Sequence, residues 1–573
     1  MPEPTNVREL IEQRFDANPG KTFLFSEADG REWTYEEFDR TVNRTANMLL
    51  SRGIWKGDVV SLLLPNSAEY IIAYYACWKV GALAGPINSL LKPEEIEWVV
   101  GNSETKLMLV GSEFQSPATS SSKPAAPRQP KRLPPLIGQG GEKARELPSL
   151  SKEGWPSGSE DGVVLSSQDP GGTDLCERII FDSVSIADEF SDTLDLVELA
   201  SDDDAIIIYT SGTTGKPKGC LLTHGNLIAN ARQIAEWMSF KDNDRLLTVM
   251  PLFHMNAVSV TTMTALYAGG STVVSPKFSS SRFWDIIDKY KVTSFGSVAT
   301  MLSMLLQKRG ECSVVGGQTE HQQSTIHDPY SDSLRFAMCG SAPVPAEVLK
   351  KFEETFGVLV VEGYGLSEST CRSTFNPPTE NRRPGSCGIP IGNEMKVFDE
   401  NDEEVPDGEL GEIVLRGPNI FKSYFKNPEA TAKAFANGWF HTGDIGYRDA
   451  DGFFFIADRK SDMIIRGGEN IYPREIDDLL YTHPAVAAAA VIGVPDELYG
   501  EEVAAFIVLK NGYKISEEEL IEFCREHLAD YKCPKTVHFV EDIPKGPTGK
   551  LLKRELTKQF AQKNSRSDSV ASD

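Results

Sequence analysis

The chain has 573 residues, of which 40% are apolar and 25% charged, a composition typical of a globular protein with more than one domain. Its 58 Lys and Arg residues against 83 Asp and Glu residues give a net charge of −25, which disfavours nucleic acid and anionic lipid surfaces as partners. The nine cysteines stand singly, without a CxxC or Cys/His cluster at metal-ligand spacing, and predict reduced thiols in a cytosolic setting.

Helical and strand patterns alternate from Val7 to about Val110. The helical segments read IEQRFDANP, TVNRTANMLLSRG and SAEYIIAYYACWKVGA, and the strand candidates read VVSLLLP and LMLVG. This alternation predicts an α/β fold of layered sheets and helices with a parallel sheet at its centre. The N-terminal segment lacks an apolar signal core, and no apolar run approaches the ~18 residues that span a bilayer, so we expect a cytoplasmic protein without a transmembrane segment.

Two stretches interrupt this pattern. Residues 116–162 are dense in Pro, Ser and Gly without a sustained period, which predicts a flexible surface insertion. Residues 310–333 read as a second inserted loop, between a helix containing Met301 to Lys308 and the strand LRFAMCG.

After Asp458 a smaller α/β stretch begins. Its strand candidates are VAAAAVIGVP, EEVAAFIVLK and VHFVEDIP, with the helix SEEELIEFCREHL between the last two. We therefore expect a large N-terminal domain over residues 1–458, a small, mobile α+β C-terminal domain over 459–560 and a disordered polar tail over 561–573.

A polar loop follows the apolar strand AIIIY. The segment from Tyr209 to Gly219, YTSGTTGKPKG, carries glycines that let backbone N–H groups turn toward an anion, hydroxyls that add donors, and lysines that add charge. A Walker A loop requires Gly-Lys followed by Ser or Thr, whereas Gly215-Lys216 is followed by Pro217. The loop therefore suits polyphosphate without being a P-loop, and by itself it does not say which phosphoryl bond is broken.

This loop is the first of seven motifs that occur in the same order as in the adenylate-forming, AMP-binding superfamily. The chain resembles the acyl-CoA synthetase or fatty-acid–CoA ligase branch of that superfamily. The other six are PLFH at Pro251 to His254, GSAP at Gly340 to Pro343, EGYGLSE at Glu362 to Glu368, GWFHTGD at Gly438 to Asp444, DRKSDMIIRGGENIYPREI from Asp458, and PKGPTGKLLKREL from Pro544. The resemblance covers nearly the whole chain. It implies an ATP-dependent acid–thiol ligase with ATP, Mg²⁺ and coenzyme A as cofactors.

The resemblance also implies roles for single residues. Glu368 is expected to bind Mg²⁺ together with Thr210, with Thr213 and Lys218 near the phosphates. Tyr364 is expected to stack on the nucleoside and Asp444 to accept the ribose hydroxyls, while Gly340 to Ala342 line the adenine and Arg459 lies near the ribose. The full nucleotide- and CoA-binding set is Thr210, Ser211, Gly212, Thr213, Thr214, Gly215, Lys218, Gly340, Ser341, Ala342, Glu362, Gly363, Tyr364, Gly365, Ser367, Asp444, Arg459, Gly467 and Gly468.

Lys550, in the sequence GPTGK, resembles the catalytic lysine of the family, which bridges the substrate carboxylate and the α-phosphate. Family members rotate the small domain between adenylation and thioester formation. The rotation brings the loop that corresponds here to Arg466 to Ile471 toward the thiol. The pivot, usually Asp or Lys, is Ser461 in this chain, a departure from the family pattern.

The sequence identifies the acid substrate and the acyl acceptor less specifically than it identifies the nucleotide site. His254 and Met255 occupy the place where amino-acid-activating relatives usually carry an aspartate, and the compact stretch from Asp458 to Ile471 favours CoA over a carrier protein as acceptor. The wall positions that the resemblance suggests are mostly small or apolar and favour a fatty or other apolar acid: His254, Asn256, Val258, Ser297, Val298, Ala299, Gly363 and Cys371. His254 is a candidate catalytic residue that either gates the acyl tunnel, as its family counterpart does, or packs against the loop. An acyl-AMP ligase that loads a carrier protein, a luciferase-like oxidation and a non-catalytic nucleotide-binding relative stay open as alternatives, and a homodimer is compatible with the sequence.

Overall fold

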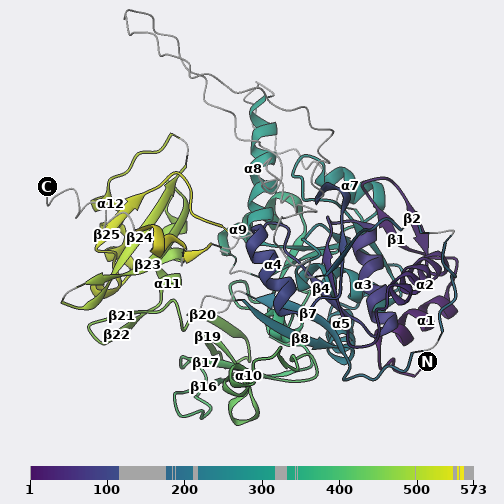
Figure 1. The fold of residues 1–573 in the computed structure, drawn as a ribbon. Helices are drawn as coiled ribbons and strands as arrows, with labels where there is room; N and C mark the ends of the chain where they lie inside the picture. The colour runs from purple at the N-terminus through teal and green to yellow at the C-terminus, as the bar shows by residue number, and fades with distance from the viewer. Residues whose placement is uncertain are drawn as a thin grey trace, which may run out of the picture.

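The computed structural model describes residues 2–114, 176–210, 217–315, 332–545 and 551–560, apart from the single positions 184, 187, 188, 196, 342, 343, 345, 497, 511 and 554, with the backbone alone described at 310–315. Figure 1 shows a large body that carries two of the sheets, a smaller sheet below it, and a separate small domain that contains the C-terminal strands.

The first sheet of the large body has nine strands, in the spatial order β15-β14-β13-β12-β11-β9-β10-β1-β2. Six neighbouring strands, from β13 to β1, are parallel, and the edge strands β14, β15 and β2 are antiparallel. The bounds are β1 (Thr22–Ser26), β2 (Glu32–Thr34), β9 (Arg245–Thr248), β10 (Ser271–Val274), β11 (Ser294–Ser297), β12 (Phe336–Cys339), β13 (Leu359–Tyr364), β14 (Thr374–Phe375) and β15 (Ile389–Pro390). Because parallel strands share a direction, the residues that follow β11, β12 and β13 meet at one edge of this sheet.

The second sheet has seven strands, in the order β18-β8-β7-β4-β3-β5-β6. The strands from β7 to β6 are parallel, while β8 and β18 extend the sheet in antiparallel pairing. The bounds are β3 (Val59–Leu63), β4 (Leu83–Pro86), β5 (Leu107–Val110), β6 (Glu177–Ile180), β7 (Asp204–Thr210), β8 (Lys218–Thr223) and β18 (Ser423–Tyr424).

Helices pack between and around these two sheets. Helix α3 is apolar on all sides and contacts β1 of the first sheet and β3 and β4 of the second, so it forms the centre of the core. Helix α2 begins with a capping box, in which Thr34 and Glu37 satisfy each other's backbone N–H groups. The bounds are α1 (Val7–Ala17), α2 (Tyr35–Ser51), α3 (Ala68–Val80), α4 (Pro93–Asn102), η1 (Ser112–Phe114), α5 (His224–Trp237), the π-helix η2 (Asn256–Met263), α6 (Thr264–Ala268), α7 (Phe283–Tyr290), α8 (Ala299–Val315), α9 (Ala346–Phe356) and η3 (Ser367–Ser369).

A four-stranded antiparallel sheet leads from the large body into the small domain. It contains β16 (Glu394–Phe398), β17 (Gly411–Arg416), β19 (Phe440–Arg448) and β20 (Phe454–Arg459), with α10 (Pro428–Ala434) and η4 (Ala436–Gly438) between β17 and β19. The small domain has a five-stranded sheet of β21 (Ile464–Arg466), β22 (Glu469–Ile471), β23 (Val486–Asp496), β24 (Gly500–Leu509) and β25 (Thr536–Phe539), with α11 (Pro473–Thr482), α12 (Glu517–His527) and η5 (Asp530–Lys532). One core cluster draws on residues from Val7 to Phe454, and another draws on residues from Ile464 to Val537.

The described elements confirm the predicted α/β architecture, including the parallel strands and every strand and helix predicted for the C-terminal stretch. The first six residues of the second predicted insertion are helical instead, because α8 continues from Gly310 through Val315. A single glycine costs a helix about 1 kcal/mol relative to alanine, which is too little to end one that is already formed. The predicted insertion at 116–162, the residues 316–331 and the tail at 561–573 lie outside the described residues.

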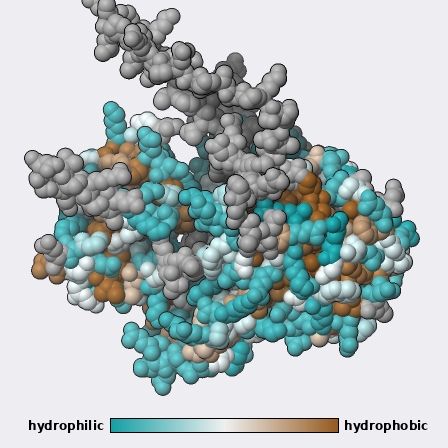
Figure 2. Space-filling model, in the orientation of Figure 1, coloured by the Kyte–Doolittle hydropathy of each residue, from teal (hydrophilic) through white to brown (hydrophobic). Residues whose placement is uncertain are grey.

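Within the described part of the chain, no helix combines the length and apolar character that crossing a membrane demands. On the face seen in Figure 2, hydrophilic side chains cover most of the described surface, and hydrophobic ones gather in smaller separate areas.

The contact between α2 and α3 contains a buried ion pair. Lys79 on α3 is 2% exposed, and its ammonium contacts the carboxylate of Asp39 and donates to Asn43 Oδ1 at 2.8 Å, both on α2. Burial lowers the pKa of Lys79, and the charge of Asp39 opposes that shift. The pair therefore fixes the register of these helices by satisfying a charge that has no access to water.

We expect Asp39→Ala to lower the free energy of unfolding by about 3 kcal/mol, because it leaves the Lys79 ammonium buried and unpaired. The double variant Asp39→Ala/Lys79→Met should recover part of this loss. Urea unfolding followed by tryptophan fluorescence measures both. Glu394→Ala, which breaks an exposed pair with Arg416, is the control and should cost much less than Asp39→Ala, because solvent screens that pair. An equal cost for Asp39→Ala and Glu394→Ala would contradict the role of burial.

Candidate active site

The predicted phosphate loop is the tip of the β7–β8 hairpin. Thr210 at the end of β7 pairs with Lys218 at the start of β8, so these two residues frame the loop. Ser211, Gly212, Thr213, Thr214 and Gly215 lie outside the described residues. The Lys218 ammonium lies 5.1 Å from the centre of the Tyr424 ring, within range of a cation–π contact.

Tyr424 connects this hairpin to Glu368. It lies in β18, directly opposite Cys220 of β8, and its hydroxyl donates to Glu368 Oε1 at 3.0 Å. Burial raises the pKa of Glu368, and the Tyr424 hydrogen bond acts in the opposite direction. A cation beside Glu368 would likewise favour the charged carboxylate, so this position suits a metal-bound phosphate tail.

The sequence analysis missed Tyr424. It stands outside the seven motifs, and no pattern in its own segment distinguishes it from a packing tyrosine. Only the pairing of β18 with β8 brings it to the phosphate hairpin.

A second polar group forms around Asp444, which is 3% exposed. The Tyr364 hydroxyl, at the end of β13, donates to Asp444 Oδ2 at 2.5 Å, and Arg459 Nε lies 3.1 Å from Asp444 Oδ1. Asp444 and Arg459 are direct cross-strand neighbours in β19 and β20. The charge of Asp444 raises the pKa of Arg459, while burial followed by the Asp444 charge raises that of Tyr364. The structure thus joins three residues that the sequence assigned to one nucleoside site.

The predicted glycines have steric roles here. A Cβ at Gly365 would lie 2.0 Å from the carbonyl oxygen of Cys371, and one at Gly363 would lie 2.4 Å from the Phe375 ring. The chain can fold back on itself after β13 only because these positions lack a side chain. Ser367, between them and Glu368, begins the short helix η3.

Glu362 contacts the surrounding loop rather than the Asp444 group. It is 8% exposed, and its Oε2 accepts a hydrogen bond from the backbone N–H of Gly385 at 3.0 Å. Burial raises its pKa to about 7.

A third group lies beyond β11 and β12. The side-chain amide of Asn256 donates to Ser341 Oγ at 3.2 Å, and Gly340 donates its N–H to the carbonyl oxygen of Ser297. His254 precedes the π-helix η2, and its ring packs on Phe253 with centroids 4.7 Å apart. Burial lowers the pKa of His254 to about 4, so the ring is neutral at pH 7. Ala342 lies outside the described residues.

The predicted thiol loop is the β21–β22 hairpin of the small domain. Gly467 and Gly468 form its turn with φ of 60° and 92°, values that favour glycine, and Gly467 donates its N–H to the carbonyl oxygen of Tyr499. Ser461 is exposed and donates to its neighbour Asp462. Lys550 lies outside the described residues.

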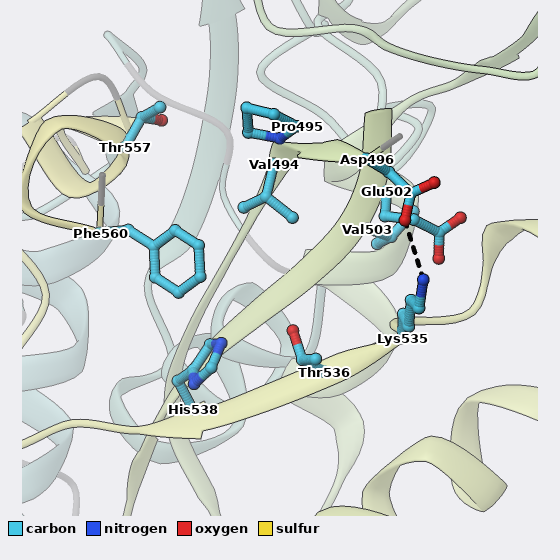
Figure 3. A pocket seen from close by; sticks show the side chains of 10 residues that line it. All are labelled: Val494, Pro495, Asp496, Glu502, Val503, Lys535, Thr536, His538, Thr557 and Phe560. Atoms are coloured by element: carbon cyan, nitrogen blue, oxygen red, sulfur yellow. Dashed lines mark hydrogen bonds and ion pairs between the residues drawn. The ribbon is translucent and has the colours of Figure 1, made fainter. Parts of the chain in front are cut away.

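The small domain also contains a cavity of about 500 Å³, bounded by β23, β24, β25 and the C-terminal segment that includes Phe560 (Figure 3). Its lining is mostly apolar, with Lys535 paired to Asp496 at 2.9 Å at one end. It includes none of the predicted site residues.

No group of three or more His, Cys, Asp or Glu side chains in the described ranges has the arrangement of a metal site. A single carboxylate at Glu368 with a nearby hydroxyl fits a cation such as Mg²⁺, which proteins hold through one or two carboxylates and the substrate's phosphates.

Comparison with known proteins agrees with this geometry. Residues 11–425 match the model of the AMP-binding enzyme family, and residues 475–550 match that of the AMP-binding enzyme C-terminal domain. The chain belongs to the AMP-binding enzyme family. Its large N-terminal and small C-terminal domains are those of this family, and it is an AMP-forming acid–thiol ligase that uses ATP, CoA and a carboxylic acid.

Individual relatives align over nearly their whole length. The oxalate–CoA ligase of Arabidopsis thaliana is 33% identical over 537 residues, which are 92% of this chain and 94% of that protein. The crystal structure of ATP-bound MatB from Rhodopseudomonas palustris has a TM-score of 0.79 at 28% identity, over 96% of this chain and 98% of the other. A fatty acyl CoA synthetase of Mycobacterium tuberculosis has a TM-score of 0.69 at 30% identity, over 98% and 99%.

We expect Glu362→Gln to flatten the pH dependence of stability. Because the folded protein raises the pKa of Glu362 from about 4.5 to about 7, it favours the protonated form, and stability is lost as pH rises through this range. The loss amounts to about 3 kcal/mol, and glutamine avoids it while its amide oxygen still accepts from Gly385.

Urea unfolding between pH 4.5 and pH 7.5 tests this expectation. The exposed Glu380→Gln serves as control and should follow the wild-type curve. A Glu362→Gln variant that keeps the wild-type slope would contradict the assignment.

Proposed function

We propose that the enzyme works in two half-reactions. A carboxylate first attacks the α-phosphate of MgATP to give acyl-AMP and pyrophosphate, and the thiol of CoA then displaces AMP to give acyl-CoA. The observation that carries this proposal is that Tyr364, at the end of β13, and Glu368, four residues later, contact two different polar groups. Tyr364 contacts Asp444, which pairs with Arg459, and Glu368 contacts Tyr424, which lies beside Lys218.

The Asp444 group is the nucleoside side of the proposed site. Both oxygens of Asp444 already have partners, and each carboxylate oxygen has a second lone pair with which to accept a ribose hydroxyl. The Tyr364 ring, held through its hydroxyl, offers a flat face for stacking, and Gly340 to Ala342 line the adenine.

The Tyr424 group is the phosphate side. Lys218 and the hydroxyls of Thr210 to Thr214 neutralise and hold the β- and γ-phosphates as they leave. Glu368 and Thr210 would hold Mg²⁺ on the phosphate tail, and the hydrogen bond from Tyr424 orients the Glu368 carboxylate. When bound, the cation supplies positive charge on the phosphate tail.

Lys550 and the small domain complete the two steps. The Lys550 ammonium stabilises charge between the carboxylate and the α-phosphate during adenylation. The turn at Gly467 and Gly468 gives the pantetheine arm of CoA close approach to the backbone during thioester formation.

The acid itself has two candidate classes. Buried apolar walls at Val258, Val298 and Cys371 favour the predicted fatty or other apolar acid. The printed names of the relatives range from oxalate to fatty acyl substrates, so relationship alone does not choose between polar and apolar acids.

ATP–pyrophosphate exchange over a panel of carboxylic acids, with and without CoA, tests the function. We expect exchange with at least one acid in the absence of CoA, and acyl-CoA with AMP once CoA is added. No exchange with any acid would overturn the proposal. Transfer to a carrier protein in place of CoA would instead support an acyl-AMP ligase, and ATP binding without turnover would support a non-catalytic relative.

We expect Lys550→Ala to slow acyl-AMP formation about 100-fold or more, since it removes a charge from the adenylation transition state. Thioester formation from supplied acyl-AMP and CoA should stay near the wild-type rate. Lys545→Ala, in the same segment, is the control and should leave both steps unchanged. Equal loss of both steps in Lys550→Ala would reject the role given to this lysine.

A further inference from the structure

Arg372 differs from the other buried cations of the described residues. Three Lys or Arg residues are buried there: Arg8, Lys79 and Arg372. Arg8 pairs with Glu12 and Lys79 pairs with Asp39, whereas no carboxylate in the described ranges pairs with Arg372, which is 1% exposed.

The contacts of the Arg372 guanidinium replace only part of the hydrogen bonding that water would give it. Nη1 lies 3.4 Å from the carbonyl oxygen of Cys371, the guanidinium carbon lies 5.5 Å from the centre of the Phe375 ring, and Nε is buried without a hydrogen-bond partner. Burying an unpaired charge costs several kcal/mol, and one long hydrogen bond with a cation–π contact offsets a small part of that. The fold therefore keeps a positive charge whose natural partner is an anion.

The guanidinium lies against Gly340, at the expected adenine lining, and against Cys371, at the expected acid wall. A Cβ on Gly340 would come within 2.7 Å of Arg372 Nη2, so the cation lies against the residue that follows β12. Ser341, next in the chain, accepts from Asn256, whose Oδ1 is itself buried without a partner. The unsatisfied atoms of Arg372 and Asn256 thus lie at the carboxyl edge of the parallel strands, where α/β sheets bind ligands.

The backbone is built to hold Arg372 in this place. Thr370 and Cys371 have φ of 60° and 147°, conformations that are strained for a residue with a side chain. The carbonyl oxygen of Arg372 accepts from the side-chain amides of Asn230 at 2.6 Å and Asn419 at 3.1 Å. A strained turn and two buried side-chain amides thus fix the backbone of Arg372. Such fixing is expected of a residue that binds a ligand and is not needed for an arginine in solvent.

We propose that Arg372 binds a second carboxylate on the acid, so that the substrate is a dicarboxylic acid with one carboxylate adenylated and the other paired with the guanidinium. The inference rests on the proposed function and narrows its substrate class. Arginine suits this role because its planar fork matches a carboxylate with two parallel hydrogen bonds and stays charged at every working pH. The neighbouring Asn256 supplies a further polar group to the bound acid.

Chain-length-matched pairs of acids test the proposal: succinate against butyrate, glutarate against pentanoate, and adipate against hexanoate. ATP–pyrophosphate exchange gives kcat/KM for each. We expect the wild-type enzyme to prefer the dicarboxylate of at least one pair by about 100-fold or more, because the monocarboxylate leaves the guanidinium unpaired. A preference for monocarboxylates throughout would overturn the inference while leaving the function intact, and exchange with neither series would overturn both.

Variants of Arg372 test whether the preference for dicarboxylates depends on this residue. Arg372→Met should reduce the dicarboxylate preference to less than about tenfold by lowering activity on the dicarboxylate alone, and Arg372→Lys should keep part of it. Arg416→Met, which removes an exposed arginine paired with Glu394, is the control and should keep the wild-type ratio.

If Arg372 instead held the reacting carboxylate, Arg372→Met would lower activity on both series equally, and this result would overturn the proposal. ATP binding measured by calorimetry shows whether each variant is folded. Should Arg372→Met not fold, the ratio in Arg372→Lys and in the wild-type enzyme still decides the matter.

Discussion

The carboxylate of Asp444 has one partner on each of its oxygens, and these partners come from different sheets. Tyr364 belongs to the nine-stranded sheet, while Arg459 ends the last strand of the four-stranded sheet. A buried carboxylate is strongly unfavourable unless it is paired, so this contact requires the two sheets to meet at a defined distance. The chain continues from Arg459 directly into the small domain, which therefore starts from a fixed point beside the site.

The phosphate side depends on a different junction. Antiparallel pairing of β18 with β8 brings Tyr424, from far along the chain, to the hairpin that carries Lys218. Glu368 reaches the same tyrosine from the first sheet, so the hydroxyl of Tyr424 links the two sheets of the large body. The two polar groups together align the edges of three sheets around the proposed nucleotide site.

Much of the fold could be predicted from the sequence, because alternating periods and motif order are local properties. The strands of the small domain and the joining of Tyr364, Asp444 and Arg459 are examples. Tyr424 and Arg372 could not be found in this way. Each is defined by what lies beside it in space. For Tyr424 this is a strand pairing, and for Arg372 it is the lack of a carboxylate partner among the described residues.

The extent of α8 was missed for a related reason. Gly310 reads as a break in the sequence pattern, but the preceding turns pack against the core at Met301, Leu302 and Leu305, and packing outweighs the propensity of one glycine. Local pattern thus identified the element correctly and its end incorrectly.

One short segment contributes a residue to the nucleoside side, to the phosphate side and to the inferred acid position of the proposed site. Tyr364, Glu368 and Arg372 follow one another at intervals of four residues, and they contact the Asp444 group, the Tyr424 group and Gly340, respectively. The positive φ values of Thr370 and Cys371 separate Arg372 from the first two, so the backbone reverses before the acid-binding position. If Arg372 binds the acid as inferred above, a substitution there changes the acid preference while the contacts of Tyr364 and Glu368 are kept. In the proposed site, nine residues thus carry both the nucleotide contacts and the inferred acid contact, with the backbone reversal at Thr370 and Cys371 between them.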